Sequence, residues 1–167
     1  MAIPDGQLYH DGALGAGRVA TTERATVNGA VAAEEVGFGK AVALKDNQAA
    51  VATAAPIYGI AVRRSYTRFY DFKEGNGADA WQKGETVGVL REGTVAVQIS
   101  EDVDAGKAAT VASDGTFKPA GSADKAVGIF LTSGDKGGTA NLQIRIDPAY
   151  TPASAASATG TSAGSGN

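Results

Sequence analysis

Short apolar runs separated by turn residues fill the chain from residue 26 to residue 147. The first runs are TVNGAVA (26–32), GKAVAL (39–44), AAVATA (49–54) and IYGIAVRR (57–64). The intervening KDNQ contains Asp46 and Asn47, whose side chains tolerate left-handed backbone and therefore suit a tight hairpin turn. This spacing predicts short β-strands, with one possible helical turn at VAAEEV (31–36).

The second half of the chain continues this pattern. TVGVLR and TVAVQI flank Glu92-Gly93, which predicts a hairpin, and alternation places a set of apolar residues on shared faces: Val87, Val89, Val95, Val97 and Ile99. Two further strand pairs are AATVA with TFKPA across SDG, and KAVGIFLTS with TANLQIRID across GDKGG. The pattern predicts roughly six strands from residue 86 to residue 147, and no helix.

Two segments that begin with Gly-Lys resemble each other. GKAVALKDNQAAVATAAPIYGIAV aligns with GKAATVASDGTFKPAGSADKAVGIFL, and each carries a Gly-Ile pair in its last aliphatic strand, Gly59-Ile60 and Gly128-Ile129. Two interpretations stay open: an internal repeat, or a chance likeness between β-rich segments of small residues. A glycine inside an aliphatic strand marks a bend or a close backbone approach, which suits the corner of a barrel or sandwich.

Neither Gly-Lys pair fits a phosphate-binding loop. That loop requires G-x-x-x-x-G-K-[ST], because the first glycine forms the turn and the hydroxyl holds magnesium. Here Glu34 and Glu101 occupy the first glycine position, and Ala41 and Ala108 follow the lysines. Both pairs are therefore expected in turns that lead into strands.

Composition argues against several kinds of chemistry. The chain has no cysteine and one histidine, His10, so thiolate sites and zinc sites with several His or Cys ligands are excluded. The run Glu101, Asp102 and Asp104 lacks the spacing of a calcium loop. The net charge of −3 and the absence of a long apolar run favour neither nucleic acid nor a membrane as partner. We expect no catalytic residues, no metal and no cofactor.

Three regions follow from the change in composition along the chain. Residues 1–25 lack sustained periodicity and are expected to form an extended N-terminal arm. Residues 26–147 form the β-rich domain. Residues 148–167 are almost wholly Ala, Ser, Thr and Gly, a composition that predicts a disordered C-terminal tail in isolation.

One stretch, RRSYTRFYDFKEGNGADAW (63–81), concentrates basic and aromatic side chains, and we call it the aromatic-basic segment. Such residues are enriched where proteins contact proteins, they can stack on nucleic acid or sugars, or they can simply fill the core. As candidate partner-binding residues we take Arg63, Arg64, Tyr66, Arg68, Phe69, Tyr70, Phe72 and Trp81.

The order of these motifs resembles a known family. GFGKAVAL, IYGIAVRR, the aromatic loop and KGETVGVLREGTVAVQISEDVDAGKAATVASDGTFKP together resemble the structural cement proteins of tailed bacteriophages, over roughly residues 36–147. The segment ATVASDGTFKPAGSADKAVGIFLTSGDKGGTANLQIRI is also similar to the β-rich head decoration proteins typified by phage lambda.

The resemblance implies a non-enzymatic virion protein with an all-β, compact sandwich or barrel-like domain (β-tulip- or jelly-roll-like). Such a protein is made in the host cytoplasm, binds the outer surface of the capsid and clamps neighbouring subunits of the major capsid protein. It also implies self-association, with a homotrimer favoured and a dimer possible. A carbohydrate-binding or adhesive β-module on the virion surface is the alternative, because exposed aromatic side chains of the aromatic-basic segment could stack on sugar rings.

Overall fold

The computed structural model describes residues 14–65, 80–148 and 150–152, and this part of the chain is all-β with no helix. The all-β prediction is confirmed. The strands are β1 (Thr26–Ala32), β2 (Val36–Gly37), β3 (Ala41–Lys45), β4 (Gln48–Val51), β5 (Gly59–Ala61), β6 (Ala80–Trp81), β7 (Thr86–Gln98), β8 (Ala108–Val111), β9 (Phe117–Pro119), β10 (Gly128–Phe130) and β11 (Thr139–Ile144).

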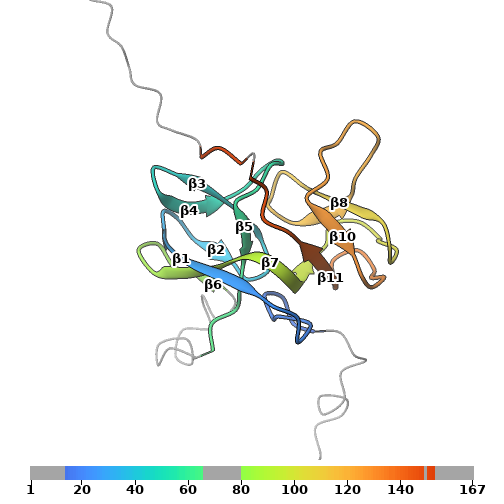
Figure 1. Cartoon of the computed structure of the whole chain (residues 1–167), viewed down its shortest axis with the longest axis horizontal. Helices are drawn as coiled ribbons and strands as arrows, with labels where there is room; N and C mark the ends of the chain where they lie inside the picture. Colours follow the sequence, from blue (N-terminus) through green and yellow to red (C-terminus); the bar gives the residue numbers. More distant parts are fainter. Residues whose placement is uncertain (1–13, 66–79, 149, 153–167) are drawn as a thin grey trace, which may run out of the picture.

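The strands form two small barrels that lie side by side, with β7 running between them (Figure 1). In the first barrel the order is β1-β4-β3-β5-β7, and pairing of β1 with β7 closes the ring. In the second barrel the order is β7-β11-β10-β8-β9, and a parallel bridge from Ile99 to Phe117 joins β7 to β9. The barrel-like architecture expected from the sequence is therefore present in two copies that share one strand.

The hairpin expected at Glu92-Gly93 is wrong. Residues 86–98 form one 13-residue strand, which pairs with β1 and β5 before Gly93 and with β11 after it. Gly93 has a φ of 129°, a backbone conformation that residues with a side chain rarely adopt, and the β1–β7 register shifts beside it. The glycine thus redirects a continuous strand from one barrel to the next instead of reversing it.

This redirection also divides the apolar alternation of β7 between two cores. Val87 and Val89 face the first core, whereas Val95, Val97 and Ile99 face the second. The helical turn considered at 31–36 is absent as well, because residues 31–32 complete β1 and Val36 begins β2.

The internal repeat is real in structural terms. β3 is flanked by β4 and β5 in the same way as β8 is flanked by β9 and β10, with antiparallel pairing throughout. The registers match residue by residue: Ala41 with Ile60 and Val42 with Gly59 in the first barrel, Ala108 with Ile129 and Ala109 with Gly128 in the second. The resemblance between the two Gly-Lys segments therefore reflects one strand plan used twice.

Both Gly-Lys pairs lie in turns, as expected. Gly39 and Gly106 have φ values of 73° and 83°, and each following lysine leads into a strand. Lys40 extends to the second barrel, where its ammonium group donates a hydrogen bond of 3.0 Å to the carbonyl of Asp114. In that turn, a hydrogen bond from the Thr116 hydroxyl lowers the pKa of the Asp114 carboxyl below its ordinary value of 3.8.

Candidate partner-binding surface

The structure describes only the two ends of the aromatic-basic segment. Arg63 and Arg64 follow β5, and Trp81 belongs to β6. The other predicted contact residues lie outside the described residues: Tyr66, Arg68, Phe69, Tyr70 and Phe72. The described ends meet on the first barrel beside the short β2–β6 pair. We call these three residues, Arg63, Arg64 and Trp81, the foot of the segment.

Trp81 is a core residue of the first barrel. Only 5% of its surface is exposed, and it pairs with Val36 across the β2–β6 ladder. Its indole N–H donates a 2.8 Å hydrogen bond to the Val62 carbonyl, and its ring meets Phe38 edge to face at 5.9 Å between centroids. A buried tryptophan needs such a partner for its N–H, so this position is satisfied within the domain.

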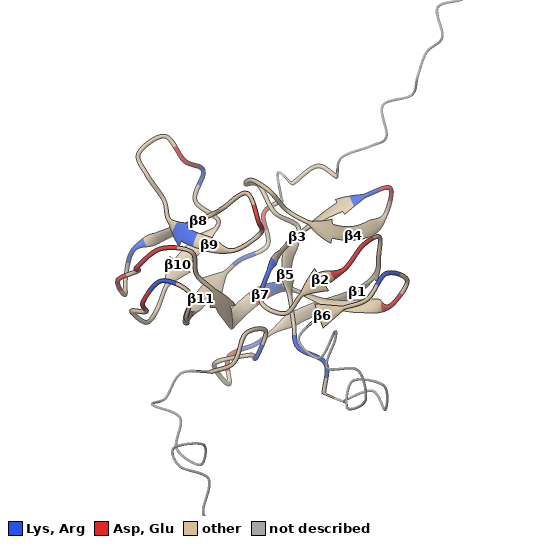
Figure 2. Cartoon of the chain, turned by 180° about the vertical axis from the view of Figure 1, so that it is seen from behind, with Lys and Arg blue, Asp and Glu red and all other residues tan. Residues whose placement is uncertain are grey.

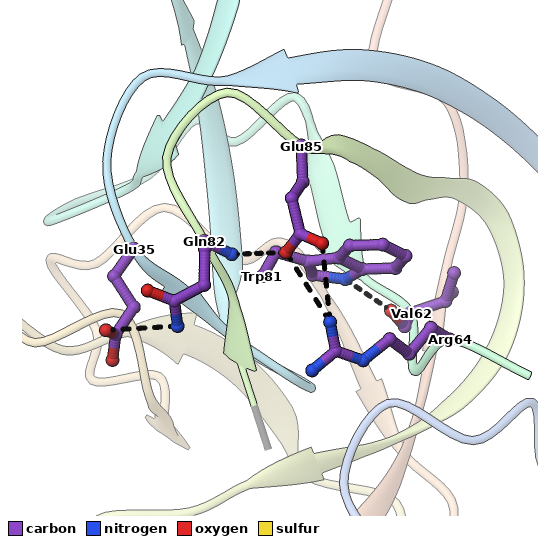
Figure 3. Close-up of polar contacts among 6 residues, drawn as sticks. All are labelled: Glu35, Val62, Arg64, Trp81, Gln82 and Glu85. Carbon is purple, nitrogen blue, oxygen red and sulfur yellow. Dashed lines mark hydrogen bonds and ion pairs between the residues drawn. The ribbon is translucent and has the colours of Figure 1, made fainter. Parts of the chain in front are cut away.

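Arg64 is buried beside Trp81, with 8% of its surface exposed. Its guanidinium lies 3.5 Å from the Glu85 carboxylate, and that carboxylate also accepts a 2.6 Å hydrogen bond from the Gln82 backbone N–H (Figure 3). The Arg64 guanidinium carbon is 5.7 Å from the Trp81 ring centroid and 5.6 Å from that of Phe38. The pair and the two rings together hold the ends of the segment at a fixed place on the barrel.

Arg63 differs from its neighbour because it is exposed. Its guanidinium carbon lies 5.5 Å from the Phe38 ring centroid, on the outside of the same cluster. Of the predicted contact residues that are described, Arg63 is therefore the exposed one, whereas Arg64 and Trp81 are buried. The burial of Trp81 also removes one aromatic ring from the set that could stack on sugars.

Sequence reasoning missed a cleft between the barrels. This cavity of about 270 Å³ is bounded by β5 and β7 on one side and by β10 and β11 on the other. At its wall the Arg91 guanidinium carbon lies 4.0 Å from the centroid of the Tyr58 ring, and Lys125 pairs with Asp147 at 2.9 Å. These residues come from four segments that are far apart in sequence, so only the docking of the barrels brings them together.

The described residues give no sign of metal chemistry or of a membrane helix. No group of three or more His, Cys, Asp or Glu side chains among them could hold a metal ion, and the chain's one histidine, His10, is outside the described part. In the same residues there is no helix of the length and apolarity needed to cross a membrane.

Comparison with known proteins identifies phage proteins of similar sequence and fold. A family model described as "Structural cement protein (E217 gp24/Pam3 gp6)" matches residues 7–145. No curated protein matches the chain. The head fiber gp8.5 N base of bacteriophage phi29 is similar in structure, with a TM-score of 0.54 and 17% identity over 72% of this chain and 94% of that chain. A chain from the capsid of Myoviridae Phage XM1 is similar over 87% of this chain and 98% of that one, with a TM-score of 0.58 and 17% identity.

Proposed function

The chain belongs to the structural cement protein family and has a capsid-associated structural role, and from this premise we propose that it binds the outer surface of a phage capsid and clamps neighbouring major capsid subunits. The observation that carries the proposal is the family match over residues 7–145, which includes both barrels. The role is structural and not catalytic.

The mechanism is thermodynamic. A protein that binds the assembled, expanded shell and not its free subunits stabilises the shell by mass action. Because an icosahedral shell repeats the binding site many times, a modest free energy at each site adds up to a large stabilisation of the whole particle.

The two-barrel architecture supports a clamp. The barrels share β7, and the apolar cluster of the second barrel also contains Ile60 and Leu90 of the first. Two lobes joined in this way resist relative displacement, so a contact made by one lobe on one capsid subunit constrains a contact made by the other lobe on the next.

We place the capsid contacts on the arm (1–25), the aromatic-basic segment and the tail (148–167), with Arg63 at the foot of the segment. Among the described residues of these two segments, residues 17–20 bond to β7 and Tyr150 accepts a hydrogen bond from Leu44 N–H in β3, so we assign the capsid contacts to the remainder of the arm and tail. Self-association is part of the same proposal. The family resemblance favours a homotrimer and allows a dimer, and of these two we adopt the dimer, on the geometry of β1 argued below.

The test is binding of purified variants to expanded capsids that lack this protein. Because the capsids are already closed, binding itself reports the outer surface. We expect Phe69→Ala with Tyr70→Ala, and separately removal of residues 153–167, to weaken binding at least tenfold by co-sedimentation. The truncation keeps Tyr150, whose hydroxyl accepts a hydrogen bond from Leu44 N–H in β3. Arg64 is left unchanged in these variants, because loss of its buried ion pair would destabilise the barrel.

The matched control is Ile129→Ala on the second barrel, an exposed apolar residue outside the proposed contacts. It should bind as the unaltered protein does. Unchanged affinity in all the contact variants would refute the assignment of those segments, and failure of the unaltered protein to bind any expanded capsid would refute the function.

A further inference from the structure

The duplicated strand plan makes β1 and the second half of β7 equivalent. β1 pairs antiparallel with the first half of β7, and the second half of β7 pairs antiparallel with β11. Each also has a parallel neighbour at its end: Ala32 lies opposite Ala49 in β4, and Ile99 lies opposite Phe117 at the start of β9. The outer edges of these two strands can therefore be compared directly.

In the second barrel this outer edge is covered. Residues 17–20 run antiparallel along it, with a bridge between Val19 and Val95. Gly17 N–H donates to the Ala96 carbonyl at 2.8 Å, and Ala96 N–H donates to the Arg18 carbonyl at 2.9 Å. The chain thus satisfies the free backbone groups of this edge with its own N-terminal segment.

In the first barrel the equivalent edge is open. The Gly88 carbonyl accepts a 2.9 Å hydrogen bond from Val62 N–H, on the β5 side of β7. The backbone groups of Gly88 therefore point toward β5 and not toward β1. Gly29 lies opposite Gly88, so these two residues share no hydrogen bond, and the backbone groups of Gly29 face away from β7. β4 covers β1 only at residues 31–32, and within the described part of the chain no strand pairs with this side of residues 27–29, which are exposed.

The composition of β1 offers none of the usual protection of an edge strand. TVNGAVA contains no charge and no proline, and its ribbon is tan throughout in Figure 2. Val27 and Val31 are 46% and 43% exposed on its outer face. An uncharged, partly apolar edge with free backbone donors and acceptors is a template for strand addition.

We propose that β1 pairs through this edge with β1 of a second copy, antiparallel and about a twofold axis at Asn28. Two open edges then satisfy each other at once, in the orientation that residues 17–20 already adopt on the equivalent edge. In this register the outward groups of Val27 meet those of Gly29 in the partner, and the absence of charge leaves no repulsion between identical strands. The pairing goes beyond capsid binding and does not depend on it, and of the two assemblies expected from the sequence it produces the dimer.

The test is sedimentation velocity of the full chain, of 16.7 kDa, over a wide concentration range. We expect a dimer in the unaltered protein and at least a tenfold higher dissociation constant for Val27→Lys, which places like charges at the joined edges. Ile129→Lys, a matched change at an exposed apolar site of the second barrel, should leave the dimer intact.

A second measurement reports the register. Because the chain has no cysteine, Asn28→Cys introduces a single thiol, and residues that face each other in a pair without mutual hydrogen bonds are close enough for a disulfide. Mild oxidation should link two copies through this variant and not through Ile129→Cys. A monomer or trimer at every concentration, a dimer that tolerates Val27→Lys, or a dimer that Asn28→Cys does not link would overturn the proposal.

Discussion

Single residues show how one strand plan accommodates two different cores. Trp81 and Gly134 occupy equivalent places, because each bridges to a matching valine, Val36 or Val103. The first core thus contains a tryptophan that the second lacks, and the second core contains instead two fully buried phenylalanines at other positions, Phe117 and Phe130. At the places equivalent to these phenylalanines the first barrel has Ala49 and Ala61. The large side chain has thus moved between positions while each interior stays filled, as close packing requires.

Trp81→Ala should be strongly destabilising. The change removes the largest side chain of the first core and a ring on which Arg64 lies. It leaves a cavity that Ala49 and Ala61 of the same core are too small to fill. We expect a loss of about 3–5 kcal/mol in the free energy of unfolding, measured by urea titration with circular dichroism. Ile129→Ala, at a residue that is 49% exposed, should stay within about 0.5 kcal/mol. A loss below about 1 kcal/mol for Trp81→Ala would show that the indole is not an essential part of the core.

Individual strands were predictable wherever the information was local. The turn at Asp46 and Asn47 takes positive φ values of 50° and 62°, and it joins β3 to β4 as those residue types indicate. The strand through Glu92-Gly93 was not predictable in this way, because a glycine between two alternating runs is compatible with a reversal and with a bend. The choice depends on β1, β5 and β11, which arrive from distant parts of the chain. The foot of the aromatic-basic segment was found from composition, whereas the burial of Trp81 depends on β2.

The two Gly-Ile pairs mark places where a neighbouring strand approaches the backbone closely. A Cβ on Gly59 would overlap the carbonyl oxygen of Leu90, and a Cβ on Gly128 would overlap that of Gln143. Gly59→Ala and Gly128→Ala should each lower the free energy of unfolding by about 2 kcal/mol or more, because backbone has to shift. Gly121→Ala is the control, since its Cβ would meet only the end of the Asp124 side chain at 3.3 Å. Equal midpoints for all three variants in thermal unfolding would contradict the close approach.

At the scale of the whole molecule, the shared strand decides how the two barrels behave. Each barrel is closed only if β7 is in place, since β7 belongs to both rings. The second core also includes Ala41, Ile60 and Leu90 from the outside of the first barrel. Neither barrel can open without exposing apolar surface of the other, so the chain is one cooperative unit although its sequence repeats.

Unfolding should therefore occur in one transition for both barrels. Fluorescence of Trp81, the chain's one tryptophan, reports the first barrel, and the amide signal of Phe130, whose N–H is bonded to the Lys107 carbonyl, reports the second. We expect the two urea midpoints to coincide, and Val36→Ala, a cavity within the first core, to lower both by the same amount. Such coupling is what a two-lobed clamp requires, because strain applied at one lobe has to be carried by the other. If Val36→Ala lowered the Trp81 midpoint and left that of the Phe130 amide unchanged, the barrels would be independent domains and the rigid clamp would fail.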